Sequence, residues 1–201
     1  MRLRAIASTL VCQLCLAIVC QAGSALADKV EKAQKDYDTA KESAAIAYRK
    51  AFSEALDGAK KVEIYLLTSA GEPQATISDE DPFSEHLPND LFPILPYKSA
   101  AKIIQRKLLS PKEIALLLPS LKTTITAEKD GVMAACHEPI HGLRIWDGKD
   151  LIFQTSICYH CENFYMTYPD GEARWIGLTD PNFQKVMEQL MPIPAKKEST
   201  K

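Results

Sequence analysis

The spacing of hydrophobic residues changes along the chain, and the longest regular pattern covers residues 28–57. This stretch holds neither Pro nor Gly, and its apolar residues are separated alternately by three and four positions. Such spacing places them on one face of a helix, which we expect to end at Asp57-Gly58. The stripe consists of Val30, Ala33, Tyr37, Ala40, Ala44, Ala47 and Ala51. Because most of these side chains are small, we expect the helix to pack on its own domain, with a coiled-coil or partner-binding arm as the alternative.

Ahead of this helix, residues 1–27 have the three-part pattern of a secretory signal peptide. Two arginines come first, an apolar run follows over residues 5–19, and small residues lead to Ala27. We expect cleavage after Ala27 and export to the periplasm or to the outside of the cell. The apolar run is shorter than the roughly 20 residues of a membrane span. The alternatives are an uncleaved anchor and lipidation at Cys20, which a poor lipobox match disfavours.

The centre of the chain predicts one clear strand and several irregular segments. Residues 62–67 are rich in β-forming residues and are typical of a strand. Residues 69–90 contain three prolines and many acidic residues, which predicts a long loop. Two prolines interrupt the apolar residues 91–97, which favours an edge strand. Residues 100–109 fit a short strand or a short helix.

A second helix is predicted to begin after Ser110. The Ser110 side chain can cap it, Pro111 suits the first helical position, and Glu113 completes a capping box. Pro119 should kink this helix or end it.

The last third of the chain predicts an antiparallel meander that a helix closes. Asp147-Gly148 is a two-residue hairpin signal, and Pro169-Asp170-Gly171 is a second turn signal. Asp180-Pro181 starts the closing helix. The strands are expected at about residues 143–146, 150–157, 163–168 and 173–178.

Together these elements predict an α+β fold. The meander, with residues 62–67 as a possible fifth strand, makes a four- to five-stranded antiparallel sheet with helices on one face and a long N-terminal helix. The expected domain organisation is a signal peptide at 1–27, the N-terminal helix at 28–60, an α+β domain at 61–195 and a disordered tail at 196–201.

Charge and hydropathy narrow the class of partner. The chain has 201 residues and a net charge of −2, so loss of the first 27 residues, with two arginines and no acid, leaves 174 residues and a charge of −4. A mildly acidic domain without a basic patch does not favour nucleic acid. No later apolar run is long enough to enter a membrane. The N-terminal helix and residues 69–90 are the candidate surfaces for an unknown protein partner.

Three cysteines remain after cleavage, and they fall in two short motifs. Cys158 and Cys161 form C-x-x-C between two predicted strands, and Cys136 precedes His141 in C-x4-H. The hairpin between the motifs brings both to the same end of the ladder. Three thiolates and one imidazole satisfy tetrahedral Zn²⁺. We therefore expect a structural zinc site with these four side chains as its ligands, and His137 as the alternative to His141.

Other states of the three thiols remain open. Cys158 and Cys161 can form a disulfide, Cys136 can bridge to either, or the thiols can be buried and inert. Redox enzymes with C-x-x-C place the first cysteine at a helix N-terminus, whereas a strand follows here. A zinc hydrolase would need an open metal position and Glu138 or His137 as its base. Since no Ser-His-Asp order, phosphate loop or H-E-x-x-H is present, a non-enzymatic binding module is favoured over these two enzymes.

Residues 136–144 and 156–163 together resemble a group of uncharacterised bacterial exported proteins. Those proteins carry C-x-x-P-x-H-G and then a strand that ends in C-x-x-C, and the resemblance covers roughly residues 91–190. The group has no assigned activity, so the resemblance implies that the two motifs act as one unit and implies no function. Many members have an aromatic residue at the position of His137, which favours His141 as the ligand.

Overall fold

The computed structural model describes residues 3–68, 75–76, 88–97, 99–127 and 137–194, with the backbone alone for residues 3–27, 75–76 and Ala173. The chain divides into two compact units, Met1–Ala45 and Ile46–Lys201. Helix α1 (Leu3–Ala55) makes up the described part of the first unit and contributes its last turns to the second. None of the described helices is both long and apolar enough to cross a membrane. The predicted tail at 196–201 lies outside the described residues.

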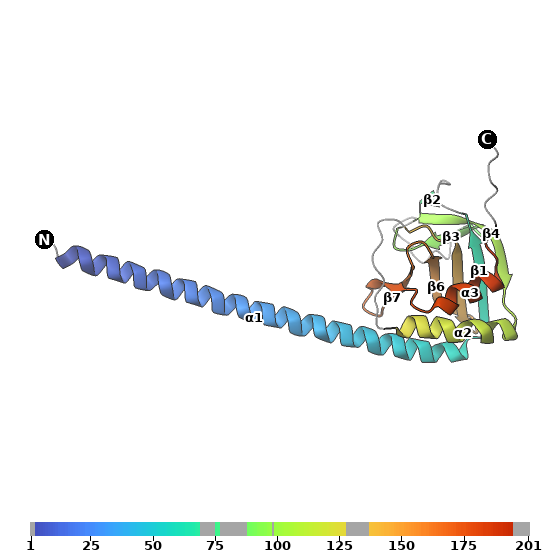
Figure 1. Ribbon diagram of the computed structural model, residues 1–201, viewed down its shortest axis with the longest axis horizontal. Coiled ribbons are helices and arrows are strands. Elements are labelled where there is room, and N and C mark those ends of the chain that lie inside the picture. The colour runs from blue at the N-terminus through green and yellow to red at the C-terminus, as the bar shows by residue number, and fades with distance from the viewer. Residues whose placement is uncertain (1–2, 69–74, 77–87, 98, 128–136, 195–201) are drawn as a thin grey trace, which may run out of the picture. The chain divides into compact units, whose positions relative to one another are not determined.

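The second unit is built on one antiparallel sheet in the order β2-β4-β1-β5-β6-β7-β8, with β3 also paired to β4 (Figure 1). The strands are β1 (Lys61–Leu67), β2 (Ala75–Thr76), β3 (Leu91–Ile94), β4 (Ser99–Leu108), β5 (His141–Asp147), β6 (Asp150–Cys158), β7 (Asn163–Thr167) and β8 (Ala173–Gly177). The antiparallel sheet and the long N-terminal helix confirm the predicted α+β class. The predicted number of four to five strands is wrong, because the described residues form a sheet of eight strands, seven of them on one path.

The additional strands come from the segments that the sequence left irregular or open. Strand β2 lies within the predicted loop 69–90, of which residues 69–74 and 77–87 are outside the described part. Strand β4 occupies the segment that fitted a strand or a helix, and it pairs along β1. Strand β3 contains Pro93 and pairs with β4 alone among the described strands, which agrees with the predicted edge position.

The four predicted strands of the meander are confirmed as β5 to β8. In their first hairpin Asp147 pairs with Asp150, so the two loop residues are Gly148 and Lys149. Gly148 has φ 62, and Lys149 is not among the residues with positive φ. A positive φ at the first loop residue alone is the pattern of a type II′ turn, which requires glycine there.

Strands β6 and β7 diverge soon after the turn that joins them. They share only two ladder pairs, which lie at Ile157 and Cys158 of β6. Beyond these pairs the hydroxyl of Thr155 donates to the carbonyl oxygen of Tyr165 at 2.8 Å and accepts from its backbone N–H at 3.2 Å. One side chain therefore replaces the backbone pairing where the strands separate.

Helices α2 (Pro111–Thr126) and α3 (Pro181–Leu190) begin where the sequence predicts. Ser110 and Glu113 form the capping box, in which the Glu113 carboxylate accepts from the Ser110 backbone N–H at 2.9 Å. The sequence predicts that α2 kinks or ends at Pro119. The helix does not end there, since it continues to Thr126. Because the residue four positions before Pro119 is exposed, water can satisfy the carbonyl that the proline leaves without an N–H.

The C-terminal part of α1 packs through a different face from the predicted stripe. All seven stripe residues are exposed, so the prediction that the stripe is buried is wrong. The buried residues of this part include Arg49 and Leu56. The Tyr48 ring lies 5.2 Å from that of Tyr168, and the Phe52 ring lies 5.3 Å from that of Phe153. Aromatic side chains bury far more apolar area than alanine, which is why they decide the packed face.

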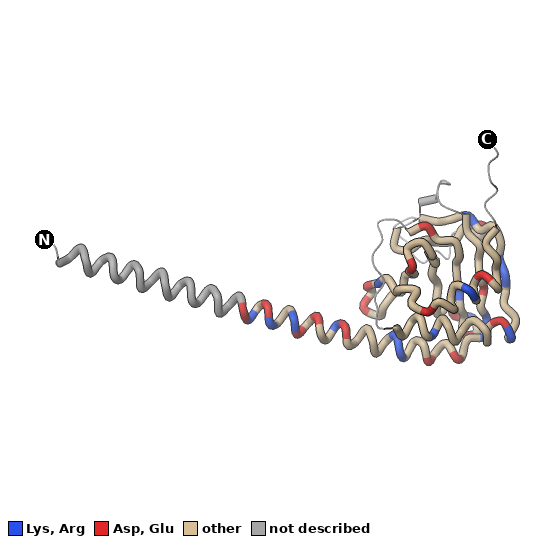
Figure 2. The backbone as a smooth tube through the Cα atoms, viewed as in Figure 1, with Lys and Arg blue, Asp and Glu red and all other residues tan. Residues whose placement is uncertain are grey.

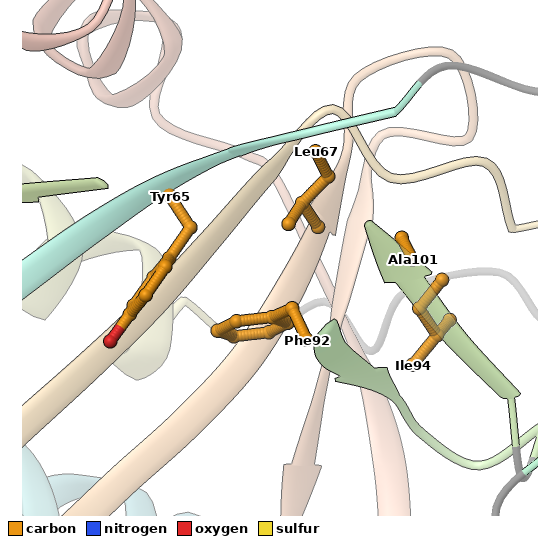
Figure 3. Packing of buried hydrophobic residues seen from close by; sticks show 5 residues of the cluster. All are labelled: Tyr65, Leu67, Phe92, Ile94 and Ala101. Atoms are coloured by element: carbon orange, nitrogen blue, oxygen red, sulfur yellow. The ribbon is translucent and has the colours of Figure 1, made fainter. Parts of the chain in front are cut away.

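The sheet buries a different group of residues on each of its two sides. The α3 side is the face on which Phe183 of α3 packs, with its ring centroid 6.4 Å from that of Phe164. The β3 side is the face that β3 covers, and there the Phe92 and Tyr65 rings lie 4.9 Å apart. Figure 3 shows this second cluster, which consists of Tyr65, Leu67, Phe92, Ile94 and Ala101.

Gly142 of β5 is the position at which this cluster meets the sheet, and its replacement by alanine should destabilise the fold. A Cβ atom there would lie 2.7 Å from two atoms of the Phe92 ring, which is fully buried, so the ring or the strand would have to shift. We expect Gly142→Ala to lower the free energy of unfolding by about 1–3 kcal/mol, measured by urea denaturation. In a Phe92→Leu background the same change should cost clearly less, because the ring is gone.

Gly58→Ala is the matched control for this prediction. A Cβ atom at Gly58 meets nothing within 4 Å, so the change should stay within about 0.5 kcal/mol of the unmodified chain. An equal cost of Gly142→Ala with and without the Phe92 ring would show that the ring is not the cause.

Candidate functional site

The C-x-x-C motif forms the turn between β6 and β7, as the sequence predicts. Cys158 is the last residue of β6, and Asn163 is the first of β7. Within the turn the backbone N–H of Cys161 donates to the sulfur of Cys158 at 3.3 Å, and Glu162 takes a left-handed φ of 50. Cys158 is buried and carries a free thiol. The hydrogen bond fixes the position of the Cys158 sulfur relative to the backbone of the turn.

His141 is a buried link between the sheet, this turn and the end of α3. Its Nε2 lies 2.9 Å from the carbonyl oxygen of Met191, so this nitrogen carries the proton and donates it. Nδ1 therefore accepts from the Tyr159 hydroxyl at 2.7 Å. Burial lowers the pKa of His141 to about 4, against the bond to Met191 and the charge of Glu188, which both raise it. Burial also raises the pKa of Tyr159, so the phenol keeps the proton that it donates.

His137 is the second buried histidine, and it joins two polar side chains of the sheet. Its Nδ1 lies 3.2 Å from Oδ1 of Asn163, and its Nε2 lies 2.9 Å from the Ser156 hydroxyl. Since Oδ1 can only accept, Nδ1 carries the proton and Nε2 accepts from Ser156. Burial lowers the pKa of His137 to about 4, against the hydrogen bonds with Asn163 and Ser156. The Trp175 ring lies 4.9 Å from the imidazole and helps to enclose it.

The two histidines lie on opposite sides of the sheet. His141 pairs with Ile157 in the β5–β6 ladder, and its side chain reaches the end of α3. Successive residues of a strand face opposite sides, so Cys158 belongs to the β3 side. His137 contacts Ser156, which precedes Cys158 by two positions and shares that side. The structure therefore brings His137, and not His141, to the side of the sheet that carries Cys158.

The predicted zinc site is only partly within the described residues. Cys136 lies outside them, and among the residues that are described no group of three or more His, Cys, Asp or Glu side chains is arranged to hold a metal ion. Glu138 and His160 are exposed. The site of Cys136, His141, Cys158 and Cys161 stays a prediction, to which the structure adds the contacts that each described side chain already makes.

Ser156, His137 and Asn163 form a chain of hydrogen bonds like that of a nucleophile, its base and an orienting group. The Ser156 residue is only 2% exposed. The space beside it, which Pro93 and Tyr165 help to line, is too small for a water molecule. A hydroxyl that neither water nor substrate reaches cannot act as a nucleophile. The chain is therefore a satisfied interior network that holds His137 in one orientation.

Sequence reasoning missed Tyr159, Asn163 and Ser156, which are the partners that fix the two imidazoles. One signal was available, because Ser156 and Asn163 are polar residues on the two predicted strands that flank C-x-x-C, and each precedes an apolar residue. Buried polar side chains need partners, so their presence beside C-x-x-C indicated a hydrogen-bonded network there. Which histidine each would contact depends on the strand register, which no single segment reveals.

Comparison of the chain with models of protein families, with curated proteins and with solved structures found no match. The resemblance that rests on the two cysteine motifs therefore stays a prediction. The contacts around the C-x-x-C turn are what support a function.

The two buried histidines should make the domain less stable in weak acid. The unfolded chain protonates each histidine below about pH 6.5, whereas the folded chain does so only below about pH 4. Between these values the unfolded state binds more protons, so the free energy of unfolding should fall as the pH is lowered. The fall should be on the order of 3 kcal/mol for each histidine. Urea denaturation over a series of pH values, with a chelator present, measures it.

Substitution separates this effect from other acid-sensitive groups. His137→Asn and His141→Asn should each lower stability at pH 7 but make the pH dependence shallower, since one titrating group is gone. His160→Asn changes an exposed side chain and should leave the slope unaltered. Identical slopes in all three variants and the unmodified chain would contradict the assignment.

Proposed function

We propose that the chain is an exported, non-enzymatic interaction module that holds a structural zinc ion at the β6–β7 turn. The observation that carries this proposal is the backbone N–H of Cys161 donating to the Cys158 sulfur at 3.3 Å, in a turn that ends in the left-handed Glu162. Such a turn lets two cysteines three residues apart present their sulfurs to one ion, and the N–H holds the first sulfur in place.

Cys136 is proposed as the third thiolate. It is bonded directly to His137, whose ring contacts Asn163, and Asn163 is the ladder partner of Cys158. Adjacent Cα atoms are about 3.8 Å apart, so the anchored His137 supports a position for Cys136 near the turn.

Both candidates for the fourth ligand already make hydrogen bonds that zinc binding would have to break. His141 is the predicted ligand, and it would have to give up its bond to Tyr159 or to Met191 and turn from the α3 side. His137 already lies on the side of Cys158, but it would have to release Ser156 or Asn163. We keep His141 as the proposed ligand and His137 as the alternative, which the experiment below separates.

Two enzymatic alternatives receive less support from the described residues. A thiol-disulfide oxidoreductase that uses Cys158 and Cys161 would gain from a helix N-terminus at the first cysteine, whereas Cys158 ends a strand and is buried. A zinc hydrolase would need an open ligand position near Glu138, and the Glu138 side chain is exposed, three residues before the buried His141. A zinc site closed by three thiolates and one imidazole has no position for water or substrate, so its role is structural.

Metal analysis of the purified protein together with a thiol count tests the proposal. We expect about one equivalent of zinc per chain and thiols that react only after a chelator removes the metal. Cys158→Ser and Cys161→Ser should each abolish zinc binding, while His160→Asn, which changes an exposed residue of the same turn, should keep it.

The other states give different results in the same assay. Thiols that react only after reduction would show a disulfide and overturn the zinc site, as would thiols that react on unfolding without any bound metal. If zinc is present, its loss in His141→Asn but not in His137→Asn identifies His141 as the fourth ligand, and the reverse identifies His137.

A further inference from the structure

The seven-residue stripe of α1 is an apolar helix face that is exposed along its whole length. Val30 is 62% exposed and Tyr37 is 60% exposed, and all five alanines of the stripe are exposed as well. The nearby buried residues Arg49 and Leu56 lie on a different face of the helix. The stripe is thus free of the contacts that hold α1 in the second unit.

The spacing of the stripe is that of a coiled coil. Its members alternate between steps of three and four residues from Val30 to Ala51 without a break. This is a period of about 3.5 residues held over three heptads, which keeps one seam facing a partner helix of the same kind. A helix that only lies on a globular core follows a period closer to 3.6.

We propose that residues 30–51 of α1 form a parallel two-stranded coiled coil with a second copy of this chain. Val30 and Tyr37 each stand at position a of a heptad, and theirs are the larger side chains that the dimer would bury. The alanines let the two backbones approach closely. The proposal concerns a surface apart from the zinc site and does not depend on it.

Charges beside the stripe select the second copy and its direction. In a parallel pair, a residue at position g faces the partner's residue at position e, five places further along. Asp36 stands at g and Lys41 at e, so each chain would place an acid opposite a base of its partner. The neighbouring g–e pairs, Lys29 with Gln34 and Ser43 with Tyr48, contain no like charges. Figure 2 shows the acidic and basic residues interspersed along this part of α1.

Sedimentation equilibrium of the protein as the cell produces it, with a chelator present, tests the association. We expect a dimer at concentrations of tens of micromolar. Asp36→Lys should weaken the dimer roughly fivefold, because each dimer then has two like-charge contacts, and Lys41→Asp should do the same. The double variant Asp36→Lys/Lys41→Asp should restore the original dissociation constant, because both pairs are again opposite in charge.

A substitution in the seam and one outside it complete the test. Ala40→Lys places a charge at a d position and should leave only monomer, whereas Thr39→Lys, on the neighbouring exposed face, should leave the dimer intact. Circular dichroism confirms that both variants keep their helix content. A monomer at all concentrations, a dimer that Ala40→Lys does not affect, or a double variant that stays as weak as the single ones would overturn the proposal. A different polypeptide bound to the stripe in the purified protein would overturn it too.

Discussion

Two neutral imidazoles, one on each side of the sheet, hold the segment that leads into β5. His137 is hydrogen-bonded to Ser156 on the β3 side. His141 is hydrogen-bonded on the other side to Tyr159 and to the carbonyl oxygen of Met191, the residue that follows α3. These bonds need uncharged rings, because a buried imidazolium would leave the acceptor nitrogen protonated and facing a donor. The start of β5, the C-x-x-C turn and the end of α3 meet there, so their arrangement depends on both rings staying neutral.

Local signals in the sequence predicted the strands of the meander. They did not predict the elements whose structure depends on packing against distant parts of the chain. Strands β5 to β8 were predictable because alternation and turn residues lie within each hairpin. Strand β4 was left open, since its adjacent pair Ile103 and Ile104 fits either period and only its neighbour β1 selects the strand. The buried face of α1 was predicted wrongly, because Tyr48 and Phe52 outweigh alanines in buried area, and spacing alone does not weigh size.

The candidate site was predictable as a turn but not as a set of contacts. C-x-x-C between two strands was sufficient to place Cys158 and Cys161 at the end of a ladder. The side on which a histidine falls depends on register, and a slip of one residue in the pairing of His141 with Ile157 would move His141 to the side of Cys158. No residue type marks that register, because a buried His near a buried Cys is compatible with both registers of the two strands.

The opening between β6 and β7 has a mechanical consequence for the rest of the molecule. Two ladder pairs next to the C-x-x-C turn and one threonine hydroxyl are the links that the β7–β8 hairpin makes to β6 through its backbone. The rest of its attachment is made by side chains, such as Phe164 packed on Phe183 and Trp175 packed on His137, so this hairpin is held to the sheet more by its side chains than by its backbone. Whatever binds at the turn therefore acts at the one place where backbone pairing joins these two of the eight described strands to the others.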